Sequence, residues 1–308
     1  SDVCSSDLHW WLAENNTKGV QVFLKHAFEM EHISTEKRVL ELVSRFDSLT
    51  SFKNFKLDGK IFDKRDLKER QRERLRKIQN LIDTKKDVRT NFVIYVYTRF
   101  ADGAADLITS LTAEKMVEKG SINPFLAKAL GLRSFDDLAR YFVVQTIGRS
   151  LGTSFGTVLE ITIRAISCGE KGEWWDVVNG DNVWSIKSGP NDMNKDQVTE
   201  FSKRAKKAIT LNLKPRILMT YGKKPSDVIT NTLNDNQLDP AQFTATGKAV
   251  YELVIGDPKY HKILLNVFSS YKREGKTLLE LVDDLVKIVS LQFKDKYSNV
   301  DDLLENTF

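Results

Sequence analysis

An aspartate and a lysine stand on two adjacent segments that the sequence predicts to be strands. Asp176 lies in Trp174–Val178, Lys187 ends Val183–Lys187, and Asn179-Gly180 between them is a strong hairpin signal. Carboxylate and carbonyl oxygens bind Mg²⁺, and a lysine beside such an ion can position or deprotonate a water molecule. These residue types together suit the hydrolysis of a phosphodiester, where the ion offsets charge on the phosphorus and on the leaving oxygen.

The register of this hairpin decides whether the two side chains meet. Ser185 and Lys187 share a face because side chains alternate along a strand. A two-residue turn at Asn179-Gly180 would leave Asp176 four residues from Lys187, about 13 Å at about 3.3 Å per residue. A four-residue loop over 179–182 would set Asp176 opposite Ser185. We predict the longer loop, or a bulge or twist with the same effect, because a one-residue slip would turn Asp176 to the other face.

The pattern Asp176…Ser185-Ile186-Lys187 resembles the PD-(D/E)XK nuclease motif, which has an acid on one strand and acid-x-Lys on the next. The longer string from Ile186 to Gln197, IKSGPNDMNKDQ, is similar to that of type II restriction endonucleases in this superfamily. The resemblance covers residues 123–222. It implies an α/β fold with a restriction-endonuclease-like core, a mixed sheet flanked by helices, between helical N- and C-terminal regions.

The resemblance also implies a role for each matching residue. Asp176, Lys187 and Glu160 would be the catalytic residues, with Lys187 as the catalytic lysine. Asp176 and Glu160 would hold Mg²⁺, and the backbone carbonyl of Ile186 would complete the metal shell. Asn191 and Lys195 would contact the DNA backbone.

The sequence departs from the motif at two positions. Trp175 replaces the proline, which is a minor change. Ser185 replaces the second acid, and this change matters more, because a hydroxyl is a poor Mg²⁺ ligand and removes one negative charge. We expect Glu160 to compensate for the lost acid; otherwise the enzyme would be weak or inactive.

Each of these residues also has a purely structural interpretation. Asp176 suits an exposed strand edge, and Lys187 suits a solvated strand end. Glu160 and Arg164 are four residues apart on a predicted helix and would form a surface ion pair. Ser188–Gln197 suits an ordinary loop and helix cap. The nearby tryptophans are expected to pack in the core rather than stack on bases: Trp174, Trp175 and Trp184.

Local patterns predict the elements around the motif. The sequence predicts a helix over Phe135–Ile147 capped by Ser134, a loop at 152–156 leading into a helix over 155–166, a helix over Lys195–Leu211 and a strand over Arg216–Tyr221. Asn91–Tyr97 fits either a strand or a buried helix, and periodicity does not decide between them. From about residue 241 to 304 the chain reads as helical.

Basic residues gather in two clusters. Lys60–Lys77 holds nine Lys or Arg residues against four acids, and a second cluster comprises Lys203, Arg204, Lys206 and Lys207. Both fit a solvated helix face with ion pairs four residues apart. Lys60–Lys77 also fits an arm that binds phosphates.

Composition excludes several classes of protein. The 308 residues carry 47 basic and 42 acidic side chains, a net charge of +5, and 41% are hydrophobic, which is ordinary for a soluble protein. No apolar run approaches the ~18–20 residues that a membrane helix needs. The two cysteines, Cys4 and Cys168, cannot form a disulfide framework or a Cys-rich zinc site, so we expect a cytoplasmic protein without a membrane partner.

Rival chemistries lack their motifs. The four histidines have no metal-ligand spacing: His9, His26, His32 and His261. The sequence contains no GxxxxGK[ST] phosphate loop and no GxSxG nucleophile elbow, which argues against an ATPase and a serine hydrolase.

We divide the chain into four parts. Residues 1–8, SDVCSSDL, resemble a translated sequencing adapter, and the sequence does not begin with Met. We therefore expect an artefact at these residues and a missing true N-terminus. Residues 9–120 form a helical region suited to DNA recognition, 121–225 the nuclease core, and 226–308 a helical C-terminal region.

The expected function is site-specific cleavage of double-stranded DNA, as in a type II restriction enzyme that acts as a homodimer. A cognate DNA methyltransferase would be a separate protein. Two alternatives stay open: a structure-selective repair or recombination nuclease, and a DNA-binding protein whose catalytic site has decayed at Ser185.

Overall fold

A computed structural model describes residues 17–31, 41–57, 68–167 and 169–308 of the chain. The adapter-like residues 1–8, the first part of Lys60–Lys77, and Cys168 lie outside the described residues. The chain forms two compact units, and each is described by itself. The first comprises the described parts of Ser1–Tyr97 together with Gly156–Phe268, and the second comprises Thr98–Phe155 and Ser269–Phe308. The boundaries predicted at 120 and 225 stay a prediction.

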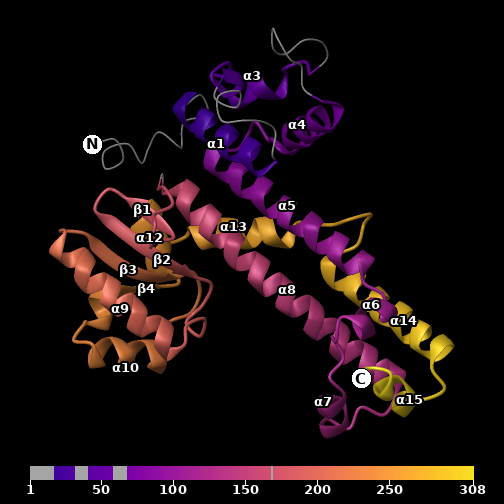
Figure 1. The fold of residues 1–308 in the computed structure, drawn as a ribbon. Coiled ribbons are helices and arrows are strands. Elements are labelled where there is room, and N and C mark those ends of the chain that lie inside the picture. Colours follow the sequence, from indigo (N-terminus) through magenta and orange to yellow (C-terminus); the bar gives the residue numbers. More distant parts are fainter. Residues whose placement is uncertain (1–16, 32–40, 58–67, 168) are drawn as a thin grey trace. The chain divides into compact units, whose positions relative to one another are not determined.

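The first unit contains an N-terminal group of helices: α1 (Thr17–Met30), α3 (Leu49–Lys53), α4 (Glu69–Leu81) and the first part of α5 (Val88–Ser110) (Figure 1). Aromatic side chains fill the space between them. Phe23 of α1 meets Phe92 of α5 edge to face at 5.8 Å, and Phe28 contacts Phe52 at 5.7 Å. Asn91–Tyr97, left open between a strand and a buried helix, belongs to α5 and is a buried helix, since six of its seven residues are buried.

The first unit also contains a four-stranded mixed sheet, so the chain has an α/β fold. Its strands are β1 (Val177–Asn179), β2 (Asn182–Lys187), β3 (Lys214–Met219) and β4 (Thr244–Thr246), in the order β1-β2-β3-β4. β1 and β2 are antiparallel, whereas β2, β3 and β4 are parallel. The predicted order of helix, hairpin, helix and strand is confirmed.

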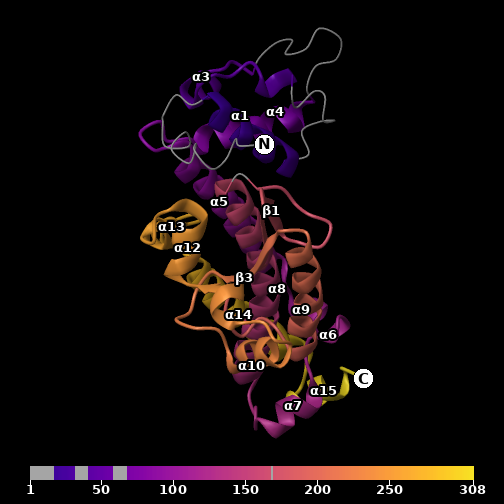
Figure 2. The same ribbon diagram turned by 90° about the vertical axis from the view of Figure 1, so that its left-hand side faces the viewer.

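Helices make the crossovers that parallel strands require. α9 (Lys195–Thr210) connects β2 to β3, and α10 (Asp227–Asp235) with α11 (Pro240–Phe243) connects β3 to β4. α9 and α10 pack together and against β3 (Figure 2) through a core that includes Val198, Phe201, Ile217, Ile229 and Leu233. α12 (Lys248–Ile255) and α13 (Tyr260–Ser269) follow β4.

The structure differs from the predicted elements at several places. β1 covers 177–179 rather than 174–178, so Asp176 directly precedes it, and β3 covers 214–219 rather than 216–221. β4 lies in the region that was expected to be helical; it is only three residues long, and its pairing with β3 rather than a local pattern defines it. The loop predicted at 152–156 is wrong, since α8 runs unbroken from Phe135 to Ile166. Glycines weaken a helix by about 1 kcal/mol each, but buried apolar residues on both sides of them offset that loss, among them Val143, Ile147, Val158 and Leu159.

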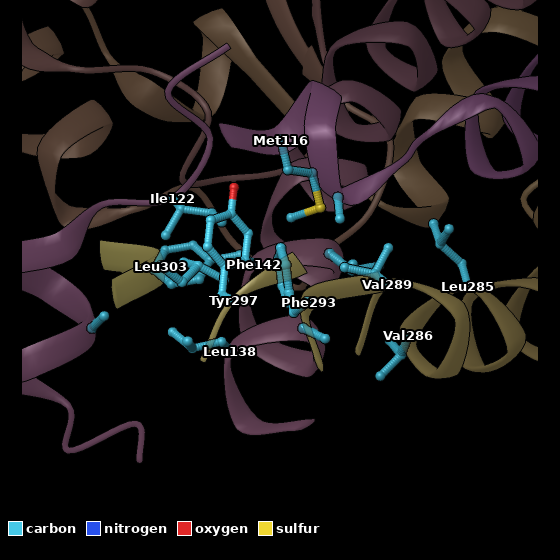
Figure 3. Close-up of a cluster of buried hydrophobic side chains, with 14 of the residues drawn as sticks. Met116, Ile122, Leu138, Phe142, Leu285, Val286, Val289, Phe293, Tyr297 and Leu303 are labelled. Carbon is cyan, nitrogen blue, oxygen red and sulfur yellow. The ribbon is translucent and has the colours of Figure 1, made fainter. Parts of the chain in front are cut away.

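The second unit consists of helices around one hydrophobic core. It contains the later part of α5, α6 (Ala113–Glu118), α7 (Pro124–Ala129), the first part of α8, α14 (Leu278–Lys296) and α15 (Val300–Glu305). Met116, Phe142, Val289, Phe293 and Leu303 meet in this core (Figure 3). The predicted cap of α8 is present, because the Ser134 hydroxyl accepts the Asp137 amide at 3.1 Å. Among the described residues, no helix combines the length and apolar character needed to span a bilayer.

Candidate active site

The hairpin that carries Asp176 and Lys187 has the register that brings Asp176 to Ser185. Val177 pairs with Trp184 and Asn179 with Asn182, so continuing the ladder sets Asp176 opposite Ser185. The predicted register is therefore confirmed, but the predicted loop length is wrong. The turn has two residues, Gly180-Asp181, one position later than the Asn179-Gly180 turn considered from the sequence. Gly180 has a φ of +59°, which suits the first central position of a type II′ turn.

The Asp176 carboxylate is fixed by two hydrogen bonds from β2. Its Oδ2 atom accepts the Ile186 amide at 2.7 Å and the Ser185 hydroxyl at 3.2 Å. Both donors bind the same oxygen, so Oδ1 has no hydrogen bond from the residues that the structure describes. Asp176 is thus held by the neighbouring strand, with one oxygen left for another ligand, and it is not the solvated strand-edge acid of the structural interpretation.

The Ile186 peptide faces the same edge as Asp176. Trp184, two residues earlier, uses its carbonyl to accept the Asp176 amide at 3.0 Å, and backbone groups alternate direction along a strand. Ile186 therefore directs both its N–H and its carbonyl toward Asp176, and the N–H bond is observed. This orientation is the one that the predicted metal-binding role of the Ile186 carbonyl requires.

Lys187 ends β2 and is partly buried. Its side chain shares a face with Ser185 because the two lie two residues apart on one strand. Its backbone is held from β3: the Thr220 amide donates to the Lys187 carbonyl at 3.0 Å, and the Thr220 hydroxyl donates to the Ser188 carbonyl at 2.9 Å. The Tyr251 hydroxyl in turn donates to the Thr220 carbonyl at 3.2 Å.

Sequence reasoning missed this support of the strand end. The residues that provide it lie far along the chain, with Thr220 32 positions from Ser188 and Tyr251 31 positions from Thr220. The only local sequence feature that pointed to this support was the strand predicted at 216–221, because a further strand could pair with the end of β2.

Glu160 lies on α8, where the charges of both hairpin residues reach it. Burial raises the pKa of its carboxyl above the ordinary value, and the negative charge of Asp176 raises it further, while Lys187 and Arg164 act in the opposite direction. Within the part of the chain that the structure describes, Glu160 and Arg164 form no salt bridge, which removes the surface ion pair as an explanation for Glu160. Glu160 therefore belongs to the electrostatic neighbourhood of Asp176 and Lys187.

The two predicted DNA contacts lie just beyond the hairpin. Asn191 is exposed in the turn after β2, and Lys195 is the exposed first residue of α9. The residues between and after them have structural roles, since Asn194 caps α9 and exchanges hydrogen bonds with Gln197 in a capping box. Part of the IKSGPNDMNKDQ string is thus a helix cap, whereas Asn191 and Lys195 are left facing solvent.

Of the three tryptophans near the hairpin, two pack against other residues and one is exposed. Trp184 is buried, and Trp175 meets Phe201 edge to face at 5.8 Å, as expected for core residues. Trp174 is exposed, with the Lys207 ammonium 4.4 Å from its ring centroid.

The basic clusters form ion pairs on helix surfaces. Arg204 of α9 pairs with Glu200 at 3.2 Å, and on α4 Arg76 pairs with Glu69 at 2.7 Å. These pairs favour the solvated-face interpretation of both clusters where the structure describes them.

The donor set fits Mg²⁺ better than a metal that needs a complete protein cage. No three His, Cys, Asp or Glu side chains among the described residues gather to hold an ion. Mg²⁺ usually keeps several waters and takes one or two carboxylates together with substrate phosphates. Oδ1 of Asp176, the Ile186 carbonyl and Glu160 would be the donors of such a partial shell, so the types of residue present fit this ion.

Comparison with known proteins assigns the chain to no family. No family model matches the chain, and a search of curated proteins found no similar sequence. The site is therefore interpreted from its own geometry.

Proposed function

We propose that this protein hydrolyses DNA phosphodiester bonds with Mg²⁺ as a PD-(D/E)XK nuclease. One observation carries the proposal: the Asp176 carboxylate is hydrogen-bonded to Ser185 and Ile186, and the register of the hairpin places it on the face of β2 that also carries Lys187. The arrangement of α8, the hairpin, α9 and the parallel strand β3 supports a restriction-endonuclease-like core.

Each residue has a role that follows from its chemistry. Bound Mg²⁺ would supply Lewis-acid stabilisation of charge on the phosphate. Asp176 and the Ile186 carbonyl orient toward one edge of the sheet and would bind the ion there. Lys187 would position the attacking water and offset negative charge, while Glu160 would add the second carboxylate that Ser185 does not provide.

The proposed substrate is double-stranded DNA, cut at specific sites as by a type II restriction enzyme. A homodimer would provide two active sites for two strands, and two-fold symmetry would match a palindromic site. Asn191 and Lys195, exposed beside the end of β2, would contact phosphates. A separate DNA methyltransferase would protect the host DNA.

A second candidate function is DNA binding without cleavage. The observation that favours it is the Ser185 hydroxyl, which donates a hydrogen bond to Asp176 at the position where the motif has a second acid. A site with this change has less negative charge to attract a divalent ion. A structure-selective nuclease is the third candidate.

The deciding experiment is a digest of long, unmethylated DNA with and without Mg²⁺. Lys187→Ala is compared with Lys214→Ala, a control at the opposite end of the same sheet, where Lys214 pairs with Asp181. We expect discrete bands that require Mg²⁺, persist in Lys214→Ala and vanish in Lys187→Ala. DNA binding without cutting in Mg²⁺ or Mn²⁺ would instead support the decayed site, and cutting only at junctions or flaps would support the structure-selective nuclease.

A further inference from the structure

An aromatic ring lies directly beyond the candidate active site. β2 and β3 pair Lys187 with Met219, and continuing that register sets Tyr221 beside Gly189, two residues past the lysine. Two residues of extended chain span at most about 7 Å, roughly the length of one nucleotide. The Tyr221 amide donates to the Ser188 carbonyl at 3.1 Å, which fixes the backbone of the tyrosine to this end of the sheet.

One face of the Tyr221 ring covers Gly189. A Cβ atom built on Gly189 would lie 2.2 Å from Cζ, 2.4 Å from Oη and 2.6 Å from Cε2 of the tyrosine. A point in the plane of the ring beside these atoms would be closer to Oη or Cε2 than to Cζ. The Cβ position is instead closer to Cζ than to Oη or Cε2, so the glycine lies against the face of the ring and not against its edge.

Much of the Tyr221 side chain beyond this contact is exposed. Tyr221 is 58% exposed although Gly189 covers one side of its ring. Gly189 itself is buried, and its amide donates to Asp192 Oδ2 at 2.7 Å, so the surface beneath the ring is held in place. The absence of a side chain at Gly189 is what allows the ring to lie there.

The surroundings of this ring suit a nucleotide. Lys223 and Lys224 follow Tyr221 and are both exposed, and Asn191 is exposed in the loop that contains Gly189. An aromatic face beside cationic side chains binds a base by stacking and its phosphates by charge. In a duplex, neighbouring bases cover each other's faces, so only a base that has left the stack can lie on the ring.

We propose that Tyr221, supported by Gly189, is a stacking platform for an unpaired nucleobase next to the phosphate held at Lys187. This inference rests on the proposed function, because it adds to the same site a contact with a base that has left the stack of the bound DNA. Stacking on an aromatic side chain strengthens binding of one base by about 5- to 100-fold.

The test measures binding of the full chain to two DNAs that differ in one nucleotide. One is a perfect duplex, and the other carries a single unpaired fluorescent base analogue whose emission falls on stacking. Lys187→Ala protein in Mg²⁺ is used so that the DNA stays intact. We expect tighter binding of the unpaired DNA by about 5- to 100-fold, with quenching of the analogue.

Substitutions at the platform separate stacking from general binding. Tyr221→Phe should keep the preference, and Tyr221→Ala should abolish it. Gly189→Ala should also abolish it at little cost in stability, because the atoms it meets belong to the far end of the tyrosine side chain. Phe125→Ala, at an aromatic residue that is 75% exposed in the other unit, is the matched control and should change nothing.

Each outcome decides between the two proposals. If the wild type cuts DNA but Tyr221→Ala keeps the preference, or the preference never exists, the platform is refuted and the nuclease stands. A preference that depends on Tyr221 in a wild type that does not cut supports the platform and refutes the nuclease. If the chain binds neither DNA, both are refuted.

Discussion

The Ser185 hydroxyl donates a hydrogen bond to Asp176 Oδ2 across the β1–β2 hairpin, over 3.2 Å. A serine thus occupies the position where a nuclease of the proposed type would have a second carboxylate. It holds Asp176 in place but contributes no charge, and the Ile186 amide binds the same oxygen. The proposed metal shell therefore depends on Asp176 Oδ1, the Ile186 carbonyl and the carboxylate of Glu160.

Replacing Ser185 by Asp should strengthen metal binding. Without a metal, the new carboxylate faces Asp176 directly and should lower the melting temperature, because like charges opposite each other on paired strands repel. Mg²⁺ should reverse this loss, so the shift in melting temperature on adding Mg²⁺ should be larger in Ser185→Asp than in the wild type. Ser185→Ala, which removes the hydrogen bond without adding charge, is the control. An equal Mg²⁺ shift in both variants would contradict a metal site at this position.

Replacing Asp176 by Asn should remove the proposed activity and preserve the fold. The side-chain amide oxygen of the introduced asparagine can still accept the Ile186 amide that Asp176 accepts now, so unfolding should be little changed. Loss of the carboxylate should lower the cleavage rate about 100-fold or more, since metal stabilisation of the transition state is worth several kcal/mol. Cleavage rate and thermal melting are measured together. A variant that melts normally and cuts like the wild type would exclude Asp176 as the central ligand.

The hairpin shows how far sequence reasoning reached and where it stopped. The alternation of side chains linked Ser185 with Lys187, and the need to bring Asp176 near them selected the correct register. The predicted four-residue loop over 179–182 is instead a two-residue turn, Gly180-Asp181, because Gly180 adopts the positive φ that the first position of such a turn needs. The register could thus be predicted from the positions of Asp176 and Lys187, whereas the turn that achieves it follows from the pairing of the two strands.

The features that sequence reasoning missed depend on contacts between distant parts of the chain. β4 is three residues long, and it exists because Thr244–Thr246 pairs with the end of β3. Tyr221 was assigned only to a strand end, since nothing local shows that its ring covers Gly189. The unbroken α8 was hidden by its glycines, whose weak helix propensity is outweighed by packing on both sides.

Glu160→Gln should stabilise the metal-free protein at neutral pH. The pKa of Glu160 is raised, first by burial and then by Asp176, so the folded state holds its proton more tightly than the unfolded state. This contribution to stability is complete below the ordinary pKa of 4.5 and is lost as the pH rises through the raised value. Glutamine carries no charge and so avoids the cost of the ionised carboxylate at this site. The melting temperature of Glu160→Gln in EDTA should therefore be higher than that of the wild type at pH 7, and it should change less as the pH rises above 4.5.

The same substitution should weaken the response to metal if Glu160 is a ligand. Added Mg²⁺ should raise the melting temperature of the wild type more than that of Glu160→Gln. In EDTA, by contrast, Glu160→Gln should be the more stable protein. A variant that gains stability in EDTA and still responds fully to Mg²⁺ would assign Glu160 to the neighbourhood of the site but not to the metal.

Phe293→Ala should destabilise the second unit strongly. Phe293 is fully buried in the core with Phe142 and Val289, and removing such a ring costs about 3–5 kcal/mol (Figure 3). Leu291→Ala on the same helix is the matched control, because Leu291 is 64% exposed and its loss should cost less than about 0.5 kcal/mol. Urea unfolding measures both values. Similar losses in the two variants would contradict the assigned orientation of α14.

His26 should make the protein sensitive to mild acid. Burial on α1, together with the charges of Lys25 and Arg164, lowers the pKa of its imidazole from 6.5 to about 4, and its ring meets Phe92 edge to face. Between these two values the unfolded state binds the proton and the folded state does not. The contribution of His26 to the free energy of unfolding is therefore complete above pH 6.5. It falls as the pH drops toward 4, by at most about 1.4 kcal/mol per pH unit.

His26→Phe removes the titrating group but keeps an aromatic ring against Phe92. We expect the free energy of unfolding of the variant to fall less steeply than that of the wild type between pH 6.5 and 4, whatever its value at pH 7.5. The comparison uses the difference between the two proteins at each pH, because carboxylates titrate equally in both and cancel. Parallel curves over this range would show that His26 is protonated in the folded state at mildly acidic pH, and would exclude it as the source of acid sensitivity.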